Sequence, residues 1–353
     1  MLVGISVAVA CFLGYYPLEA VRVHFGGVEH LRKHTSRTLI VGTACLAILA
    51  LCEVGAAALR LELRLGKGQT YYQKGVVDQK ITQTVMNQQQ TIDQNIGTGL
   101  KLDVLEVDGE GNMRIRYTYL WFRFKSTNPM LQQDYDSARK APVPSGAEGF
   151  AALIGQSYVM ELSPGGKVLK IEGMKELREA VLQKMSASAR AAPTMQVLNT
   201  FLDEGSIKEM AEASMAVYPD KAVDQGDSWE EKANLTIGFP VMTESKWTLQ
   251  KRAGGVATVD QTSSIRSNPD APPMDAGGMK MKADLSGTQE GTLLVDEKTG
   301  LITSNKARQK IKGDLKLGAS AEGPFDMMTI PIAFETVVVT EASDRMWETP
   351  SEQ

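Results

Sequence analysis

The sequence predicts a mainly β protein of the α+β type: a curved antiparallel sheet, or half-barrel, with a central helical segment at residues 174–217. Three observations lead to this fold class. Apolar and polar residues alternate along much of the chain after residue 58, which is the period of half-buried strands. Turn sequences rich in Gly, Asp and Asn separate these runs. Within the central segment, apolar residues take the spacing of amphipathic helices instead.

These patterns divide the chain into five segments. Residues 1–58 are a signal peptide or membrane segment, 59–173 a β-rich unit, 174–217 the helical segment, 218–340 a second β-rich unit, and 341–353 a loose acidic tail. A pattern of Gly, a polar residue, a hydroxyl residue and an aromatic residue recurs from Gly68, Gly155 and Gly226, each time before a predicted strand. This repeat has two interpretations: two related β-units, or one large unit in which several strands begin with a similar sequence.

The N-terminal segment predicts export. A basic stretch at residues 32–37 precedes an apolar run at 38–52, and small residues follow up to Ala58, where we expect cleavage. The run is shorter than the roughly 20 residues that span a bilayer, so a retained membrane anchor or a lipoprotein is the less favoured alternative. Because a signal peptide beginning near residue 30 is oddly placed, the residues before it are expected to come from a start site assigned too early. The body is then periplasmic or secreted, or membrane-anchored if uncleaved.

The first β-rich unit opens at residues 59–65, where leucine alternates with charged residues and predicts a strand with one wet face. The predicted hairpins are 79–85 with 90–96, 101–107 with 113–125, and 158–162 with 168–171. The turn at 108–112 uses Gly for positive φ and Asp or Asn to close it. Its alternating oxygens also resemble a calcium loop, but Met113 stands where that loop needs glycine and Tyr119 where it needs glutamate.

Three helices are predicted next, at residues 175–189, 194–202 and 206–217, with Pro193 and Gly205 as natural breaks. Since they lie between two β-rich regions, we expect them to pack on a sheet as an insertion or cap. The strands predicted after them are 244–251, 256–266, 282–295, 301–317 and 328–339.

A methionine-rich loop spans residues 268–278 of the second β-rich unit. Met274, Met279 and Met281 could supply thioether ligands to Cu(I). We favour a flexible loop with methionine as adaptable packing. A third interpretation is that methionines line an apolar cavity between sheet and helices.

The positions of histidine and cysteine restrict the chemistry of the body. All six residues of these two types lie before residue 59: His24, His30, His34, Cys11, Cys45 and Cys52. This placement excludes Ser-His-Asp and Cys-His catalysis, and metal sites built on imidazole or thiolate, from the rest of the chain. No glycine-rich phosphate loop joins a strand to a helix, and a formal net charge of −4 argues against a nucleic-acid partner. We expect no cofactor, no metal and no catalytic residue.

An aromatic strand at residues 117–124 is the best candidate for a ligand surface. Its candidate residues are Tyr117, Tyr119, Trp121, Phe122 and Phe124. Strict alternation assigns the first three to one face and the two phenylalanines to the other. Because both faces are then partly apolar, we expect this strand to be central in the sheet.

Several short motifs resemble a known family. They are Gly68-Gln69-Thr70-Tyr71, the stretch at residues 78–83, the hairpin turn at 163–168 and Gly226-Asp227-Ser228-Trp229. The chain resembles an uncharacterised family of exported bacterial proteins, catalogued only as a domain of unknown function, and this resemblance supplies no catalytic residues. More loosely, the expected architecture is similar to bacterial lipoprotein-carrier and lipid-binding half-barrels, which is a likeness of fold alone.

The leading functional hypothesis is a non-catalytic envelope protein that binds a lipid, another apolar ligand or a protein partner. One alternative is a hydrolase of envelope polymers that acts through paired carboxylates, which must face each other across a cleft. The other alternative is a purely structural module.

Overall fold

The computed structural model describes residues 58–127, 132–190, 194–276, 279–318 and 327–348, all within one compact unit. The predictions for the signal peptide, the start site, Pro193 and the end of the acidic tail fall outside these residues. Within the described ranges, no helix is both long and apolar enough to cross a membrane.

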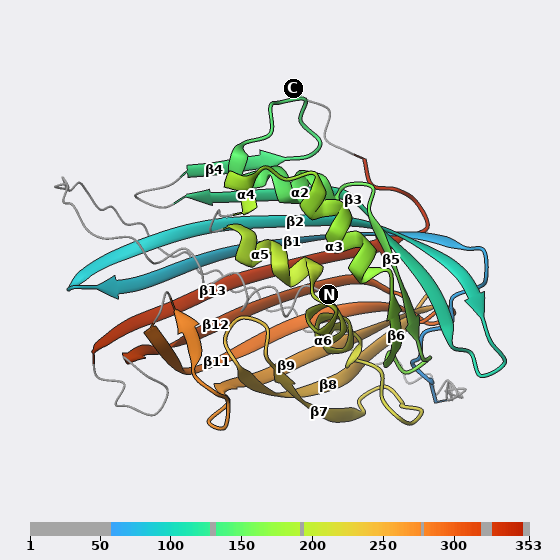
Figure 1. Ribbon diagram of the computed structural model, residues 1–353. Helices are drawn as coiled ribbons and strands as arrows, with labels where there is room; N and C mark the ends of the chain where they lie inside the picture. The colour runs from blue at the N-terminus through green and yellow to red at the C-terminus, as the bar shows by residue number, and fades with distance from the viewer. Residues whose placement is uncertain (1–57, 128–131, 191–193, 277–278, 319–326, 349–353) are drawn as a thin grey trace, which may run out of the picture. The chain divides into compact units, whose positions relative to one another are not determined.

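Thirteen strands form one antiparallel sheet (Figure 1). Their order is β6-β5-β3-β2-β1-β13-β12-β11-β9-β8-β7, with β4 paired to β3 and β10 to β11. The strands are β1 Thr70–Val85, β2 Gln88–Val107, β3 Met113–Thr127, β4 Gln132–Asp136, β5 Ser157–Leu162, β6 Val168–Glu172, β7 Ser228–Leu235, β8 Val241–Ala253, β9 Val256–Ser267, β10 Met274–Ala276, β11 Met279–Asp296, β12 Ile302–Gly318 and β13 Met328–Ser343. Because β1 pairs with β13, the two predicted β-rich units join into one continuous sheet.

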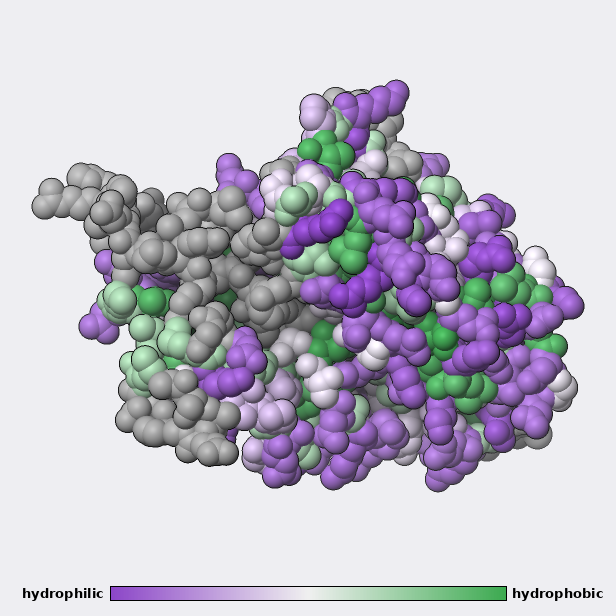
Figure 2. Space-filling model, in the orientation of Figure 1, coloured by the Kyte–Doolittle hydropathy of each residue, from purple (hydrophilic) through white to green (hydrophobic). Residues whose placement is uncertain are grey.

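The helices lie against one face of this sheet, here called the inner face (Figure 1). They are the 3-10 helix η2 Ser145–Ala147, and α2 Glu148–Leu153, α3 Met174–Gln183, α4 Ala187–Arg190, α5 Thr194–Leu202 and α6 Glu204–Met215. The predicted central helical segment is confirmed, whereas the six-residue α2 is too short to show a helical period and was not expected. Asp203, rather than Gly205, marks the start of α6, because its carboxylate accepts the Ser206 N–H at 2.7 Å. In the same orientation, Figure 2 shows hydrophilic and hydrophobic side chains interspersed on the visible surface around α3 and α6.

The predicted turns are confirmed. Met86 and Asn87 both have positive φ, as a two-residue hairpin turn between β1 and β2 requires. The Asp108 carboxylate accepts hydrogen bonds from the backbone N–H of Glu110 at 2.8 Å and of Asn112 at 2.9 Å. These bonds give the Asp108 side-chain oxygen a role within the turn itself. The three repeated glycines at Gly68, Gly155 and Gly226 have φ of 80°, 82° and 94°, and each lies two residues before a strand. Whether the repeat reflects a duplication stays a prediction.

Residues 59–65 do not form the predicted strand of the sheet. Their leucines are buried and their charged residues point outward, as the alternation indicates. However, the backbone crosses the ends of hairpins instead of pairing along a strand: Leu63 N donates to Pro164 O and Arg64 N to Thr299 O, both at 2.7 Å. We call this segment the strap. The alternation of apolar and charged residues predicts which side chains are buried, but it does not predict which segment the backbone pairs with.

The expectation of a loose chain after Thr340 is wrong for the first residues of the tail. β13 continues to Ser343, and its pairing with β1 continues to the same residue. Beyond the strand, the Trp347 ring lies edge-on to the Tyr72 ring, with centroids 6.5 Å apart.

The inner face carries two apolar clusters. The larger lies beneath the helices and includes Phe150, Phe201 and Met210 from them. The smaller lies toward the opposite end of the strands and includes Ile81, Ile311 and Phe334. Ala213 of α6 is the one described helical residue packed against it.

A row of buried, uncharged polar side chains, the polar row, separates the two clusters. Strand pairing places its members opposite one another, one on each of seven neighbouring strands. They are Ser126, Gln94, Gln79, Thr336, Gln309, Gln289 and Ser263. Half-buried Ser245 on β8 extends the row by one strand.

Candidate functional site

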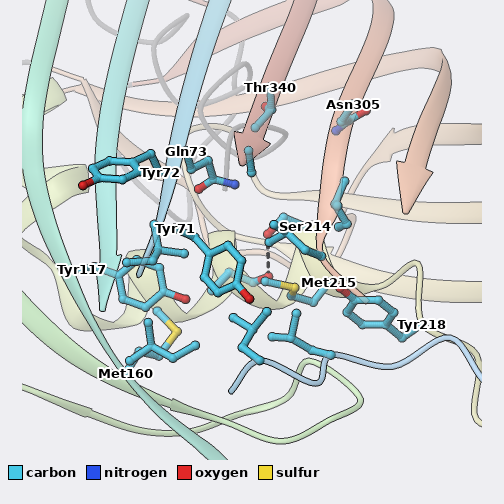
Figure 3. Close-up of a pocket in the computed structure, with 18 residues that line it drawn as sticks. Tyr71, Tyr72, Gln73, Tyr117, Met160, Ser214, Met215, Tyr218, Asn305 and Thr340 are labelled. Atoms are coloured by element: carbon cyan, nitrogen blue, oxygen red, sulfur yellow. Dashed lines mark hydrogen bonds between the residues drawn. The ribbon is translucent and has the colours of Figure 1, made fainter. Parts of the chain in front are cut away.

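A cavity lies between α6, the strap and the inner face of the sheet (Figure 3). It is lined by Leu63, Leu65, Tyr71, Tyr72, Gln73, Leu102, Ile115, Tyr117, Met160, Ala211, Ser214, Met215, Tyr218, Leu301, Ile302, Asn305, Thr340 and Ala342. We call it the tyrosine cavity. None of these described lining residues is charged. It encloses about 60 Å³, which is room for a few water molecules.

Tyr71, Tyr117 and Tyr218 are three of the polar residues that line this cavity, and the others are Tyr72, Gln73, Ser214, Asn305 and Thr340. Tyr71 begins β1 and donates its hydroxyl to Gln69 Oε1, and Tyr218 follows α6 and donates to the Gly300 carbonyl, both at 2.6 Å. The Tyr117 ring stacks on Tyr158, with centroids 5.4 Å apart. Burial raises the pKa of Tyr117 and Tyr218 well above the ordinary value of 10, so both stay neutral at physiological pH. The cavity therefore offers apolar contact and neutral hydrogen bonds, and no base.

Two carboxylates fasten α6, which forms one wall of the cavity. Glu209 accepts the backbone N–H and the hydroxyl of Thr236, and Glu212 accepts the Val168 N–H at 3.1 Å. At the C-terminal end of α6, Met215 packs directly on Gly166, where a β-carbon would overlap its side chain. The C-terminal end of the helix therefore packs on the predicted hairpin turn at residues 163–166.

A bulge in β3 changes the faces assigned to the aromatic strand. Pairing with β2 shifts at Leu120, so that Tyr119 lies opposite Leu100 and Trp121 opposite Gly99. As a result Tyr117, Tyr119, Phe122 and Phe124 share the inner face, and Trp121 lies on the outer face. The strict alternation expected from the sequence is wrong here, because an unpaired residue reverses the phase of all residues after it.

Only one of the five candidate residues, Tyr117, lines the tyrosine cavity. Tyr119 is buried in the larger cluster, and its hydroxyl has no hydrogen-bond partner among the described residues. Phe122 stacks on Phe150 of α2 at 4.4 Å, and Phe124 packs against the same ring. Whether any of the five contacts a ligand stays a prediction.

Trp121 is held on the outer face by polar and glycine neighbours. Its indole N–H donates to Asp136 Oδ1 at 2.8 Å, and Lys74 Nζ lies 4.9 Å from the ring centroid. The ring covers Gly97, where a β-carbon would overlap it. This packing explains why glycine occurs in the middle of a long strand.

Sequence reasoning missed the other cavity residues. Tyr71 ends the first Gly-Gln-Thr-Tyr motif, which was the available signal, whereas Tyr218 carries no pattern of its own. The cavity methionines are Met160 and Met215, while Met274 and Met281 face each other across β10 and β11 and contact the smaller cluster. Among the described residues, no group of three or more His, Cys, Asp or Glu is placed to hold a metal ion.

The sequence from residue 110 to 302, more than half of the chain, matches the model of a family described as "Family of unknown function (DUF6263)". The chain belongs to this family. The expected resemblance to a domain of unknown function is thereby confirmed, although the motifs at residues 68–71 and 78–83 lie before the matched stretch. Comparison with curated proteins gives no significant match.

Solved structures show only remote similarity. Lipovitellin, in a structure concerned with its lipid–protein interactions, gives a TM-score of 0.42 at 9% identity, over 81% of this chain and 26% of that one. OccK5 (OpdH) of Pseudomonas aeruginosa gives 0.20 at 7% identity, over 78% and 98%. The outer membrane protein OprD from Pseudomonas aeruginosa gives 0.18 at 6% identity, over 81% and 96%. The chain thus spans about a quarter of lipovitellin, and similarities this low carry no functional argument.

Proposed function

We propose that this protein is a non-catalytic binding protein that holds an apolar ligand, a lipid, between α6 and the inner face of the sheet. The observation that carries the proposal is the tyrosine cavity, whose described lining is uncharged and mostly apolar. Pockets for small apolar molecules combine such walls with a few placed polar groups. Neutral Tyr71, Tyr117 and Tyr218 supply those groups.

Binding an acyl chain requires α6 to move outward. The enclosed 60 Å³ is far below the few hundred Å³ typical of ligand pockets. The flexible side chains of Met160 and Met215 at the wall can take other rotamers to enlarge it. Each square ångström of apolar surface covered by the ligand then contributes about 25 cal/mol.

The alternatives receive less support from this geometry. A carboxylate-based hydrolase needs two facing carboxylates, and no described lining residue of the tyrosine cavity is Asp or Glu. A protein partner or a purely structural module needs no cavity at all. We therefore propose a non-catalytic role. An envelope protein is the second class of partner that we propose, and we propose no nucleic-acid partner.

We also propose that the body acts outside the cytoplasm, in the periplasm or in the secreted state. The support is the basic stretch, apolar run and small residues that end at Ala58. N-terminal sequencing of the mature protein tests this proposal. A first residue of Leu59 is expected, whereas an intact N-terminus with the body in the cytoplasm would contradict it.

Native mass spectrometry and lipid extraction of the purified full chain test the binding proposal. We expect a co-purifying lipid near one equivalent in the wild type. Ala211→Leu fills the tyrosine cavity and should lower that amount at least threefold, while Ala187→Leu, on an exposed position of α4, should leave it unchanged. Equal lipid content in the two variants, or no lipid in the wild type, would contradict the proposal. Circular dichroism confirms that each variant is folded.

A further inference from the structure

The part of the polar row on β12, β11 and β9, together with Gln261 on β9, forms a directed chain of hydrogen bonds. Gln309 Nε2 donates to Gln289 Oε1 at 3.3 Å, and Gln289 Nε2 donates to Gln261 Oε1 at 3.0 Å. Gln261 Nε2 donates to Ser263 Oγ at 3.1 Å. Because every amide points the same way, the chain leaves an acceptor at its first member. Gln309 Oε1 has no hydrogen-bond partner among the described residues, although Gln309 is only 3% exposed.

A second cavity lies where this chain faces α6. It encloses about 30 Å³ between the polar row, Ala213 of the helix and Ala216, the residue that follows the helix. Gln309 and Trp247 both line it. The Trp247 indole N–H also has no partner among the described residues, and Trp247 is 3% exposed. Two residues that line this cavity therefore carry an unpaired polar atom among the described residues: an acceptor on Gln309 and a donor on Trp247.

Leaving such groups unpaired is unfavourable, because a buried donor or acceptor without a partner costs about 1–3 kcal/mol. Gln309 and Trp247 lie on β12 and β8, three strands apart in the sheet, so satisfying both takes two polar groups of a ligand, one that donates to Gln309 and one that accepts from Trp247. Hydroxyl and amide groups can do both, whereas an ester only accepts.

The charges around the second cavity restrict the ligand further. Glu231 is the one charged residue in its described lining, and it is exposed on the edge strand β7. No lysine or arginine in this lining is placed to neutralise a phosphate or carboxylate. Since an unpaired charge is far more costly to bury than a neutral polar group, an anionic head group fits poorly.

The two cavities border the same helix. Ala211 and Met215 of α6 line the tyrosine cavity, and Ala213 of α6 and Ala216, the next residue after the helix, line the second one. A ligand that displaces α6 outward therefore meets the walls of both. The second cavity also has apolar walls at Val241 and Ile265, next to its free polar groups.

We propose that the second cavity recognises the hydroxyl or amide groups of a neutral amphiphile, with Gln309 as acceptor for one group and Trp247 as donor to another. This inference rests on the proposed function and names the class of its ligand. It selects uncharged amphiphiles, such as acylglycerols or fatty amides, over fatty acids and anionic phospholipids.

Binding of three oleoyl probes to the delipidated full chain tests this inference. Monoolein carries hydroxyl groups, methyl oleate only accepts hydrogen bonds, and oleate is anionic. We expect the wild type to bind monoolein at least tenfold more tightly than oleate. Gln309→Met removes the acceptor at similar length, so it should weaken monoolein about tenfold and methyl oleate less than twofold. Trp247→Phe removes the donor and should weaken both esters.

The control is Gln250→Met, the same substitution at an exposed position of β8, which should change no affinity. Equal weakening of monoolein and methyl oleate by Gln309→Met, or tighter binding of oleate than of monoolein, would overturn the inference while leaving the proposed function standing. If the wild type binds none of the three probes, the proposed function fails as well. Trp247→Phe provides an independent readout if Gln309→Met does not fold.

Discussion

Gly97 on β2 and Trp121 on β3 form a contact that fixes the outer face of the sheet. The indole ring covers the glycine, so that a β-carbon at Gly97 would overlap ring carbons of Trp121. The backbone at Gly97 is not in the left-handed region, so the expected cost of alanine there is steric and not conformational. The pair therefore tests whether Trp121 is a packed structural residue or a free ligand-binding one.

The expected magnitude follows from two opposing effects. Overpacking a buried contact costs about 1–3 kcal/mol, and replacing glycine with alanine returns about 0.4–1 kcal/mol through the unfolded chain. Gly97→Ala should therefore lower the free energy of unfolding by about 1–2 kcal/mol. In the background of Trp121→Ala the overlap is absent, so the same change should be neutral or stabilising. The resulting coupling energy is about 2 kcal/mol.

Urea unfolding of the four proteins of this double-mutant cycle measures the coupling. Gly109→Ala is the matched control, because a β-carbon at that turn position has no neighbour within 4 Å, and it should change stability by less than 0.5 kcal/mol. A coupling energy near zero would refute the packing of Trp121 on Gly97. So would an equal loss of stability in Gly97→Ala and Gly109→Ala.

Two further predictions concern the helices and the turns. Phe201→Ala on α5 removes a fully buried ring that packs edge-on against Phe122, with ring centroids 5.4 Å apart. It should lower the free energy of unfolding, measured in urea, by about 3–5 kcal/mol. Leu169→Ala is the control, because Leu169 is 46% exposed, and it should lower this free energy only slightly. A near-equal cost for the two would contradict the packing of α5. The Thr299 hydroxyl donates to Asp296 and lowers the pKa of that carboxyl below its ordinary value of 3.8. The ionised carboxylate therefore stabilises the folded state above about pH 4. This contribution to stability disappears as the pH falls through the lowered pKa. Asp296→Asn should therefore reduce Tm at pH 7 and converge with the wild type near pH 2, and a constant difference across this range would contradict it.

Local sequence signals predicted much of this fold because their causes are local. Turns such as Asp108 to Asn112 and the glycine pair at 254–255 are fixed by residues that adopt positive φ or accept nearby N–H groups. Helices 174–183 and 204–215 follow from their own apolar spacing. These features need no information about distant parts of the chain.

The features that were missed depend on distant pairing. The bulge at Leu120 is visible only when β2 and β3 are aligned, and it moved Trp121 to the outer face. The polar row joins Gln79, Gln289 and other residues far apart in sequence, each of which is a glutamine, serine or threonine at a position where alternation expects an apolar residue. A glutamine in the buried phase of a strand was the available signal. It became meaningful only once the strand order was known.

The four tryptophans of the chain provide the most direct test of where a ligand binds. Trp229 and Trp247 are partners across β7 and β8 and belong to the inner face, whereas Trp121 and Trp347 lie on the outer face beside Gly97 and Gly99. The bromine atoms of 1-(9,10-dibromostearoyl)glycerol quench tryptophan fluorescence on close approach. At a probe concentration that saturates each variant, the probe should quench the wild type and Trp121→Phe/Trp347→Phe, and this quenching should be lost in Trp229→Phe/Trp247→Phe. Quenching that persists in the inner-face variant and disappears in the outer-face variant would contradict binding between α6 and the sheet.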